Sequence, residues 1–319
     1  MPTILVSAPY LLASLDRFRP VLERYGFSLL TPAVQERLEE TELMMYAGQF
    51  DGALCGDDCY SARVLQACLP RLKVLSKWGT GIDSIDAEAA DRFGIRVCRT
   101  PNAFTLAVAD SVLGYLLAFA RRQPWMDRGM KAGAWEKLPG RALHECVLGI
   151  VGVGTIGKVV VHRARAFGMK VLGTDIVEID QAFLAETGME MTTLDDLLAR
   201  ADFVSLNCDL NPTSRHLMNS RTLARMRPQA VLINTARGAV IEEAALIAAL
   251  SKGTIGGAAL DVFEIEPLTA DSALRGMDNV LLAPHNANSS PAAWERVHWN
   301  TIRNLVEGLG MTYRGVEQE

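Results

Sequence analysis

The sequence predicts an α/β protein with two domains, each built around a parallel β-sheet. Its 319 residues exceed the size at which single hydrophobic cores usually stop growing. Short apolar segments alternate with amphipathic stretches along most of the chain, which is the pattern of parallel strands joined by crossover helices. The alternation occurs in two series, separated by a long apolar segment at residues 103–120.

The first series predicts five strands within the first hundred residues. In chain order the apolar segments read ILVSA, FSLLTP, GALCG, LKVLSKW and IRVCRT. We expect helices in the connections, including one over VQERLEETELMMYA at residues 34–47.

The second series predicts a larger parallel sheet. Its segments read VLGIVG, KVLGTD, MEMTT, DFVSLN, AVLINTA, GAALDVF and VLLAPH. Further helices are expected at residues 103–121 and 291–309. The two series together predict two Rossmann-like or flavodoxin-like domains with a cleft between them, and such clefts are where ligands prefer to bind.

Composition favours a small-molecule partner. The net charge is −5, with 32 Lys and Arg against 37 Asp and Glu, and the basic residues are scattered, so nothing favours nucleic acid. The six cysteines include no C-x-x-C pair, and the first residues lack the basic region of a secretion signal. We therefore expect free thiols, a cytoplasmic location and no bound metal.

The apolar segment at residues 103–120 is long enough to raise the question of a membrane span. Asp110 lies in its middle, and an ionised carboxylate at that depth would be costly. We interpret the segment as a helix buried between domains or subunits.

A glycine-rich loop predicts a dinucleotide site. Gly152, Gly154 and Gly157 follow the strand VLGIV, and a helix is expected to begin near Thr155 and Ile156. The glycines would allow a tight turn, close approach of a pyrophosphate, and close packing of helix and strand. The next strand ends in Asp175, whose carboxylate suits ribose hydroxyls and repels a 2′-phosphate. NAD is therefore favoured over NADP, against the alternative of an ordinary glycine turn.

Three further segments end strands of the second sheet with chemically useful residues. INTARG supplies Arg237, DVFEIEP supplies Glu266, and APHN supplies His285. Arginine matches a carboxylate, and a histidine beside a glutamate can exchange a proton near neutral pH because the carboxylate raises its pKa. The alternatives are a helix-cap arginine, a solvated loop acid and a surface histidine.

These segments, with LKVLSKWGTGIDSID, TPNAFTLAVAD and GAWEKL upstream, resemble the D-isomer-specific 2-hydroxyacid dehydrogenases over nearly the whole chain. The resemblance implies that Arg237, Glu266 and His285 are catalytic and that Asp261 contacts the nicotinamide. Further cofactor contacts are expected from Thr105, Val108, Cys208, Thr235 and Ala236. Substrate contacts are expected from Lys77, Trp78, Gly79 and Thr80, although Lys77 could be solvated and Trp78 simply part of the core.

The resemblance also implies a domain division and an assembly. Residues 1–101 with 286–319 would form the substrate-binding domain, and residues 102–285 the NAD-binding domain. A homodimer built on the NAD-binding domain would cover the apolar helix.

Some residues depart from the family pattern or carry no motif. Asp57 and Asp58 stand where phosphoglycerate dehydrogenases often have Arg-Ser, which disfavours a phosphorylated substrate. Glu264 is interpreted as a spacer. The other histidines are interpreted as surface or packing residues: His144, His162, His216 and His298.

We therefore expect an NAD-dependent oxidoreductase that interconverts a small 2-keto acid, such as hydroxypyruvate, glyoxylate or 3-phosphohydroxypyruvate, and its D-2-hydroxy acid. Formate dehydrogenases are a rival within the fold, but they pair a glutamine with the histidine. An NAD-sensing scaffold similar to the C-terminal-binding corepressors is the alternative without turnover.

Overall fold

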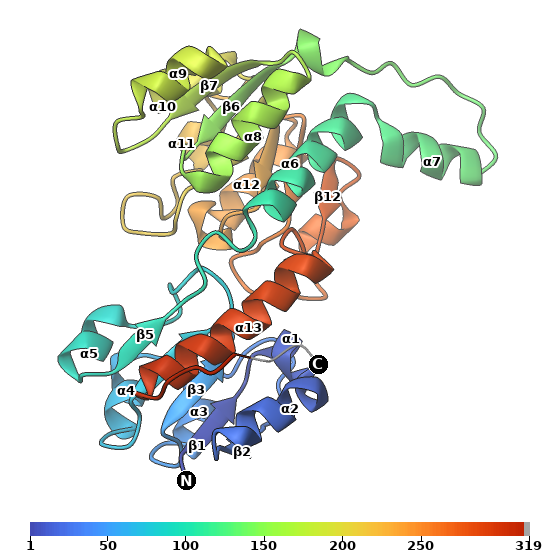
Figure 1. Cartoon of the computed structure of the whole chain (residues 1–319). Coiled ribbons are helices and arrows are strands. Elements are labelled where there is room, and N and C mark those ends of the chain that lie inside the picture. Colours follow the sequence, from blue (N-terminus) through green and yellow to red (C-terminus); the bar gives the residue numbers. More distant parts are fainter. Residues whose placement is uncertain (316–319) are drawn as a thin grey trace. The chain divides into compact units, whose positions relative to one another are not determined.

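A computed structural model describes residues 1–315 and divides the chain into two compact units. Unit 1 contains residues 1–103 and the segment from Ser290 onward, and unit 2 is Phe104–Ser289. The sequence analysis placed these two divisions after residues 101 and 285. Each unit has its own parallel sheet, so the predicted fold class is confirmed (Figure 1).

The sheet of unit 1 has five strands within the described residues, in the order β2-β1-β3-β4-β5, all parallel. This is the flavodoxin-like order. The strands are β1 (Thr3–Val6), β2 (Ser28–Leu30), β3 (Gly52–Cys55), β4 (Val74–Lys77) and β5 (Arg96–Cys98).

Helices pack on the sheet of unit 1. They are α1 (Pro9–Leu12), α2 (Leu15–Arg24), α3 (Glu40–Met45), α4 (Ala62–Ala67), α5 (Ala87–Arg92) and α13 (Pro291–Gly308). Although α13 comes last in the chain, it packs on β3, β4 and β5, and the backbone oxygen of Thr301 accepts a 2.7 Å hydrogen bond from Ser76 Oγ of β4.

Helix α3 is shorter than the expected span of residues 34–47. Glu39 caps it, because its backbone N–H donates to Glu42 Oε2 at 2.8 Å in a capping box. The preceding N–H, of Leu38, donates instead to the buried Asp58 carboxylate at 2.7 Å. The N–H of Leu38 is therefore hydrogen-bonded to a distant residue and is not available for a helical turn before Glu39.

The sheet of unit 2 has seven strands within the described residues, in the order β12-β11-β10-β9-β6-β7-β8. The strands are β6 (Val147–Val151), β7 (Lys170–Thr174), β8 (Glu190–Met191), β9 (Phe203–Leu206), β10 (Val231–Asn234), β11 (Gly257–Leu260) and β12 (Val280–Leu282). All pairings are parallel. The strand order reverses between β6 and β9, and such switch points are where open α/β sheets bind ligands.

Both faces of the unit 2 sheet are covered, as buried parallel strands require. The helices are α6 (Thr105–Ala120), α7 (Gln123–Lys131), α8 (Thr155–Ala166), α9 (Gln181–Thr187), α10 (Leu194–Arg200), α11 (Ser220–Leu223) and α12 (Glu243–Ser251). One core cluster joins α6, α8 and α9 to the sheet, and a second joins α10, α11 and α12 to it.

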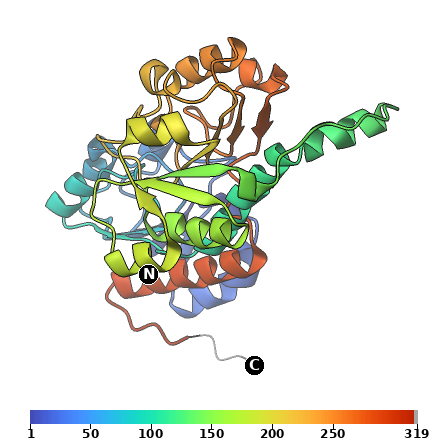
Figure 2. The same ribbon diagram turned by 90° about the horizontal axis from the view of Figure 1, so that it is seen from above.

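The apolar segment at residues 103–120 forms α6, and eight of its side chains are buried. Asp110 forms a 2.7 Å ion pair with Arg163 of α8. No helix among residues 1–315 has both the length and the hydropathy that crossing a bilayer requires. The next helix, α7, has no buried residue and runs out from the rest of unit 2 as an arm (Figure 2).

Candidate active site

The glycine loop closes tightly at the switch point of the unit 2 sheet. Gly152 has φ +92°, and a Cβ there would lie 2.6 Å from the backbone nitrogen of Cys208, which follows β9. A Cβ on Gly157 would lie 2.2 Å from the carbonyl oxygen of Gly152. A Cβ on Gly154, by contrast, would meet no atom within 4 Å. Two glycines are thus required by packing, whereas the third leaves open space beside the first turn of α8.

Asp175 organises the same loop. Its Oδ2 accepts a 2.6 Å hydrogen bond from Val153 N, and its Oδ1 accepts a 3.1 Å hydrogen bond from Val177 N. Thr155 and Ile156 begin α8, where the N–H groups of the first turn have no partner in the helix and favour an anion. The carboxylate therefore stands beside a positive helix terminus and keeps lone pairs for hydroxyl donors.

Buried polar atoms without partners lie along the edge where β9 and β10 end. Asn207 Oδ1 and Thr235 Oγ1 are both buried, and neither has a hydrogen-bond partner within residues 1–315. Ala236 N donates to Asn234 Oδ1 at 3.0 Å. Buried polar groups are normally hydrogen-bonded, so these two atoms, together with the open space at Gly154, fit a polar dinucleotide.

The remaining expected cofactor residues lie near this edge or at the start of unit 2. Cys208 is half-buried, and burial raises the pKa of its thiol to about 11. Thr105 and Val108 lie in the first turn of α6, and both side chains are buried.

The six cysteines form no disulfide.

The structure brings His285 and Glu266 together. His285 Nδ1 lies 2.9 Å from Glu266 Oε2, and both side chains are about a quarter exposed, at 24% and 22%. The other carboxylate oxygen, Glu266 Oε1, accepts a 2.9 Å hydrogen bond from Phe263 N. Both oxygens of Glu266 are thereby directed, one to the backbone of its own loop and one to the imidazole.

Asp261 fixes the turn that carries His285. It is the first residue after β11, is 1% exposed, and its two carboxylate oxygens accept hydrogen bonds from Asn286 N at 2.8 Å and Ala287 N at 2.9 Å. Its carbonyl oxygen accepts His285 N at 2.7 Å. His285 has φ +51°, a left-handed conformation that costs about 1–2 kcal/mol outside glycine. These three hydrogen bonds hold the turn despite that cost.

Burial raises the pKa of Asp261, and the backbone hydrogen bonds from residues 286 and 287 and the nearby imidazole of His285 oppose this effect. The sequence analysis assigned Asp261 only to the nicotinamide. The positioning of His285 was missed, although a charged residue directly after the buried run GAAL is the signal that could have suggested it.

Arg237 follows β10 on a loop that abuts the one carrying Glu266. Its Nη1 donates to the carbonyl oxygen of Ala236 at 2.9 Å, and its own carbonyl oxygen accepts from Asn234 Nδ2 at 2.9 Å. A Cβ on the next residue, Gly238, would lie 1.9 Å from the carbonyl carbon and oxygen of Phe263. The two backbones therefore touch without a side chain between them, which ties the position of one loop to that of the other.

The expected substrate residues at 77–80 lie in unit 1, where β4 ends. Lys77 is buried, and its Nζ forms a 3.0 Å ion pair with Asp57 Oδ1. Thr80 Oγ1 donates to the carbonyl oxygen of Thr100 at 2.9 Å, and Gly79 has φ +123°. The loop is thus fixed by its own hydrogen bonds.

The two acids that follow β3 differ in environment. Asp57 pairs with Lys77, whereas Asp58 is fully buried and accepts hydrogen bonds from Ser7 Oγ at 2.6 Å, Leu38 N at 2.7 Å and Gly56 N at 3.1 Å. Burial raises the pKa of Asp58, and those hydrogen bonds oppose the effect. Asp58 is therefore a structural residue of unit 1.

Trp78 belongs to an aromatic cluster of unit 1. It is 5% exposed, stacks on Tyr10 with ring centroids 4.9 Å apart, and donates from Nε1 to His298 Nδ1 at 3.0 Å.

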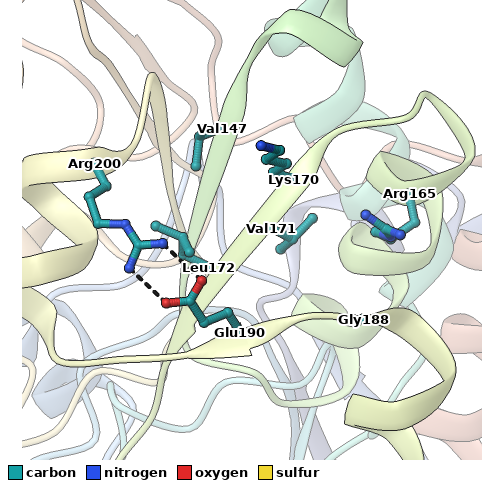
Figure 3. Close-up of a pocket in the computed structure, with 8 residues that line it drawn as sticks. All are labelled: Val147, Arg165, Lys170, Val171, Leu172, Gly188, Glu190 and Arg200. Carbon is teal, nitrogen blue, oxygen red and sulfur yellow. Dashed lines mark hydrogen bonds and ion pairs between the residues drawn. The ribbon is translucent and has the colours of Figure 1, made fainter.

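A separate pocket of about 190 Å³ lies near the amino ends of β6 and β7, whereas the glycine loop follows the carboxyl end of β6 (Figure 3). Val147 and Lys170, the first residues of β6 and β7, line it. Figure 3 shows the Arg200 guanidinium facing the Glu190 carboxylate, with contacts of 2.7 and 2.8 Å. The pocket contains none of the expected site residues, and Arg200 and Glu190 in its lining pair with each other.

Fold and site together define a dinucleotide-binding α/β protein with a histidine–carboxylate pair, and comparison with known proteins agrees. The family "D-isomer specific 2-hydroxyacid dehydrogenase, NAD binding domain" matches residues 113–287. The chain is 40% identical over 275 residues to a glyoxylate reductase of Thermofilum pendens, covering 84% of this chain and 81% of the relative. It is 35% identical over 281 residues to a hydroxypyruvate reductase of Thermotoga maritima, covering 86% and 90%.

A solved structure agrees as well. D-lactate dehydrogenase of Aquifex aeolicus, in complex with NAD and lactic acid, has a TM-score of 0.83 at 27% identity, covering 94% of this chain and 93% of that one. The chain belongs to the D-isomer-specific 2-hydroxyacid dehydrogenase family. It is an NAD-dependent oxidoreductase, as the sequence analysis expected.

Proposed function

We propose that the protein interconverts a small 2-keto acid and its D-2-hydroxy acid, with His285 as the acid and base. The observation that carries this proposal is the 2.9 Å contact between His285 Nδ1 and Glu266 Oε2. A carboxylate on Nδ1 fixes the ring orientation and stabilises the imidazolium, so that Nε2 is the nitrogen that exchanges a proton with substrate.

NAD, when bound, supplies or accepts the hydride, and the chain's residues manage the proton and the substrate. In reduction His285 Nε2 donates a proton to the carbonyl oxygen of the keto acid, and in oxidation it accepts the proton of the hydroxyl. Glu266 keeps its charge opposite the imidazolium in both directions. One proton therefore moves for each hydride, and the reaction balances.

Arg237 is assigned to the carboxylate of the substrate, because its planar guanidinium can hold a carboxylate with two hydrogen bonds. Gly79 and Thr80 are assigned to the same carboxylate through backbone N–H groups. Trp78 is assigned as a wall of the substrate site. The ion pair of the buried Lys77 with Asp57 favours a role for Lys77 in shaping the loop rather than in holding an anion.

The cofactor contacts follow the loop and the strand ends of unit 2. Gly152, Gly154 and Gly157 with the start of α8 would hold the pyrophosphate, and Asp175 the adenosine ribose. The orphaned Thr235 Oγ1 and the backbone near Cys208 and Ala236 would face the cofactor. Thr105, Val108 and Asp261 are assigned to its nicotinamide half.

Among candidate acids, hydroxypyruvate and glyoxylate are favoured over 3-phosphohydroxypyruvate. The charge of Lys77 is balanced by Asp57, so the loop after β3 offers no uncompensated cation for a phosphate. Relatives named glyoxylate reductase and hydroxypyruvate reductase support this choice.

We further propose that the protein is a cytoplasmic homodimer joined through unit 2. Helix α7 has no buried residue, and Trp135 in the segment that follows is 88% exposed. An exposed tryptophan on a projecting arm supports a protein interface.

The test is NADH consumption against a panel of 2-keto acids, with wild-type protein and the His285→Ala variant. The proposal expects turnover of glyoxylate or hydroxypyruvate by the wild type and a loss of about 10²–10⁴ in the variant. Tight NAD binding without turnover of any keto acid would instead favour the scaffold alternative. Undiminished turnover by the variant would remove the acid–base role of His285.

A further inference from the structure

A second histidine–glutamate pair lies in unit 2, on the segment that carries Glu266. His216 Nε2 is 2.6 Å from Glu264 Oε1. The sequence analysis interpreted His216 as a surface or packing residue and Glu264 as a spacer. The contact joins the long loop after β9 to the loop after β11, two residues before the proposed partner of His285.

Glu264 is also anchored to the start of α12. Its Oε2 accepts a 3.3 Å hydrogen bond from Glu243 N, while its own N–H donates to Glu243 Oε2 at 3.2 Å. Glu243 is the first residue of α12, where N–H groups lack helical partners and a negative charge is favoured. Glu264 is thus held to α12 through both its backbone N–H and its side chain.

The backbone holds His216 in place for this contact. Its N–H donates to the carbonyl oxygen of Ala239 at 2.8 Å, and its carbonyl oxygen accepts from Asn219 Nδ2 at 2.9 Å. His216 has φ +50°, a conformation that a non-glycine residue adopts only where its surroundings enforce it. Ala239 follows the Arg237–Gly238 turn, so His216 is also bound to the loop of the proposed substrate-binding arginine.

We propose that His216 and Glu264 are positioning residues for the proposed acid–base pair. They hold residues 263–266 against α12 and the Arg237 loop, so that Glu266 keeps its carboxylate on His285 Nδ1. Phe263 N and Gly238 transmit this restraint, the first through its hydrogen bond to Glu266 Oε1 and the second through backbone contact with Phe263.

Removing the imidazole of His216 would leave the carboxylate of Glu264 near the charge of Glu243 without a donor from the β9 loop. The pKa of Glu243 is already raised, first by burial and also by the charge of Glu264. Repulsion between the two would move the segment that ends in Glu266. This inference rests on the role proposed above for Glu266 and His285.

The test compares His216→Ala with His216→Gln, whose amide can still donate to Glu264. His162→Ala is the matched control, because His162 of α8 is a half-exposed histidine whose Nδ1 lies 3.8 Å from Oε1 of Glu186 in α9, a different glutamate. The pH dependence of kcat and KM is measured for each in the reductive direction, and Glu266→Gln is run alongside as the reference.

We expect His216→Ala to lower kcat about tenfold, as a small misplacement of a catalytic group does, and to shift the high-pH limb of the kcat profile in the same direction as Glu266→Gln. His216→Gln should restore both, and His162→Ala should change neither. If His216→Ala does not fold, the variant His216→Asn is measured in its place, because its amide is shorter than that of His216→Gln.

A His216→Ala profile that superimposes on the wild type, while Glu266→Gln shifts, would overturn the positioning role. Equal losses in His216→Ala and His216→Gln, or a lower Tm with an unmoved pH profile, would also overturn it. An unshifted Glu266→Gln profile would instead contradict the proposed function itself.

Discussion

Two histidines, one in each unit, face opposite kinds of partner. His285 of unit 2 directs Nδ1 at the carboxylate of Glu266, 2.9 Å away, whereas His298 of unit 1 accepts a 3.0 Å hydrogen bond at Nδ1 from the indole N–H of Trp78. A carboxylate stabilises a protonated imidazole, but an indole N–H can only donate and so requires a ring nitrogen without a proton. The partner atom therefore decides which histidine can carry charge.

Burial strengthens the contrast. His298 is 5% exposed, and its ring lies 5.1 Å from that of Phe18 and 5.7 Å from that of Trp78. Desolvation lowers the pKa of His298, more than the nearby Glu295 raises it. His298 is thus held neutral as part of a core, whereas His285 is paired with a carboxylate, as the proton-transfer role proposed above requires. The two histidines thus differ in their neighbouring groups and not in residue type.

The largest expected effect comes from making the same substitution in both histidines. His285→Gln should lower kcat by about 10²–10⁴, because general acid–base catalysis is lost, with little change in Tm. His298→Gln should keep kcat within about threefold, since it touches no reacting group. Steady-state rates and thermal unfolding of the two variants check this, and equal losses of activity would contradict the different roles of the two histidines.

A smaller effect is expected from Asp261→Asn, which alters the turn beneath His285. One amide oxygen can replace only one of the two carboxylate acceptors, and its NH2 would face the other backbone N–H. We expect a loss of about 1–3 kcal/mol in the free energy of unfolding, and kcat lower by about tenfold or more because His285 shifts. Urea unfolding and steady-state kinetics measure both. Retained kcat in a destabilised variant would separate Asp261 from the positioning of His285.

The smallest effect concerns stability against pH. The pKa of His298 is lower in the folded state than in the unfolded chain, where it is about 6.5. Its contribution is therefore complete above that pH and is lost as pH falls toward the folded pKa, with a slope of at most about 1.4 kcal/mol per pH unit. The free energy of unfolding of His298→Gln, compared with wild type between pH 7 and pH 5, should fall less steeply. Parallel curves would show that His298 does not titrate on unfolding.

The sequence predicted the strands better than their surroundings. Each short segment expected as a strand contains one, because a buried parallel strand appears in the sequence as a short run of apolar residues. The start of α3 was wrong because Leu38 N bonds to Asp58, twenty residues later in the chain. A contact of that kind has no local pattern.

The residues of the candidate site likewise include some that sequence motifs indicate and some that they do not. The glycine loop and the segments that hold Arg237, Glu266 and His285 carry motifs, so their residues could be named in advance. The contacts of His216 and His298 could not be predicted, because each depends on a single atom, Glu264 Oε1 or Trp78 Nε1, that only the folded chain brings close. Asp261 was named for one role, while its hydrogen bonds to residues 286 and 287 add another.

We propose that the carboxylate of Glu266 keeps His285 able to hold a proton. The direct test is the pH dependence of kcat/KM for glyoxylate reduction and glycolate oxidation in wild type and Glu266→Gln, which keeps the shape of the side chain and removes its charge. We expect the high-pH limb of reduction to move about 1–3 pH units lower in the variant, and the low-pH limb of oxidation to move in the same direction. Limbs that coincide with those of the wild type in both directions would contradict this role of Glu266.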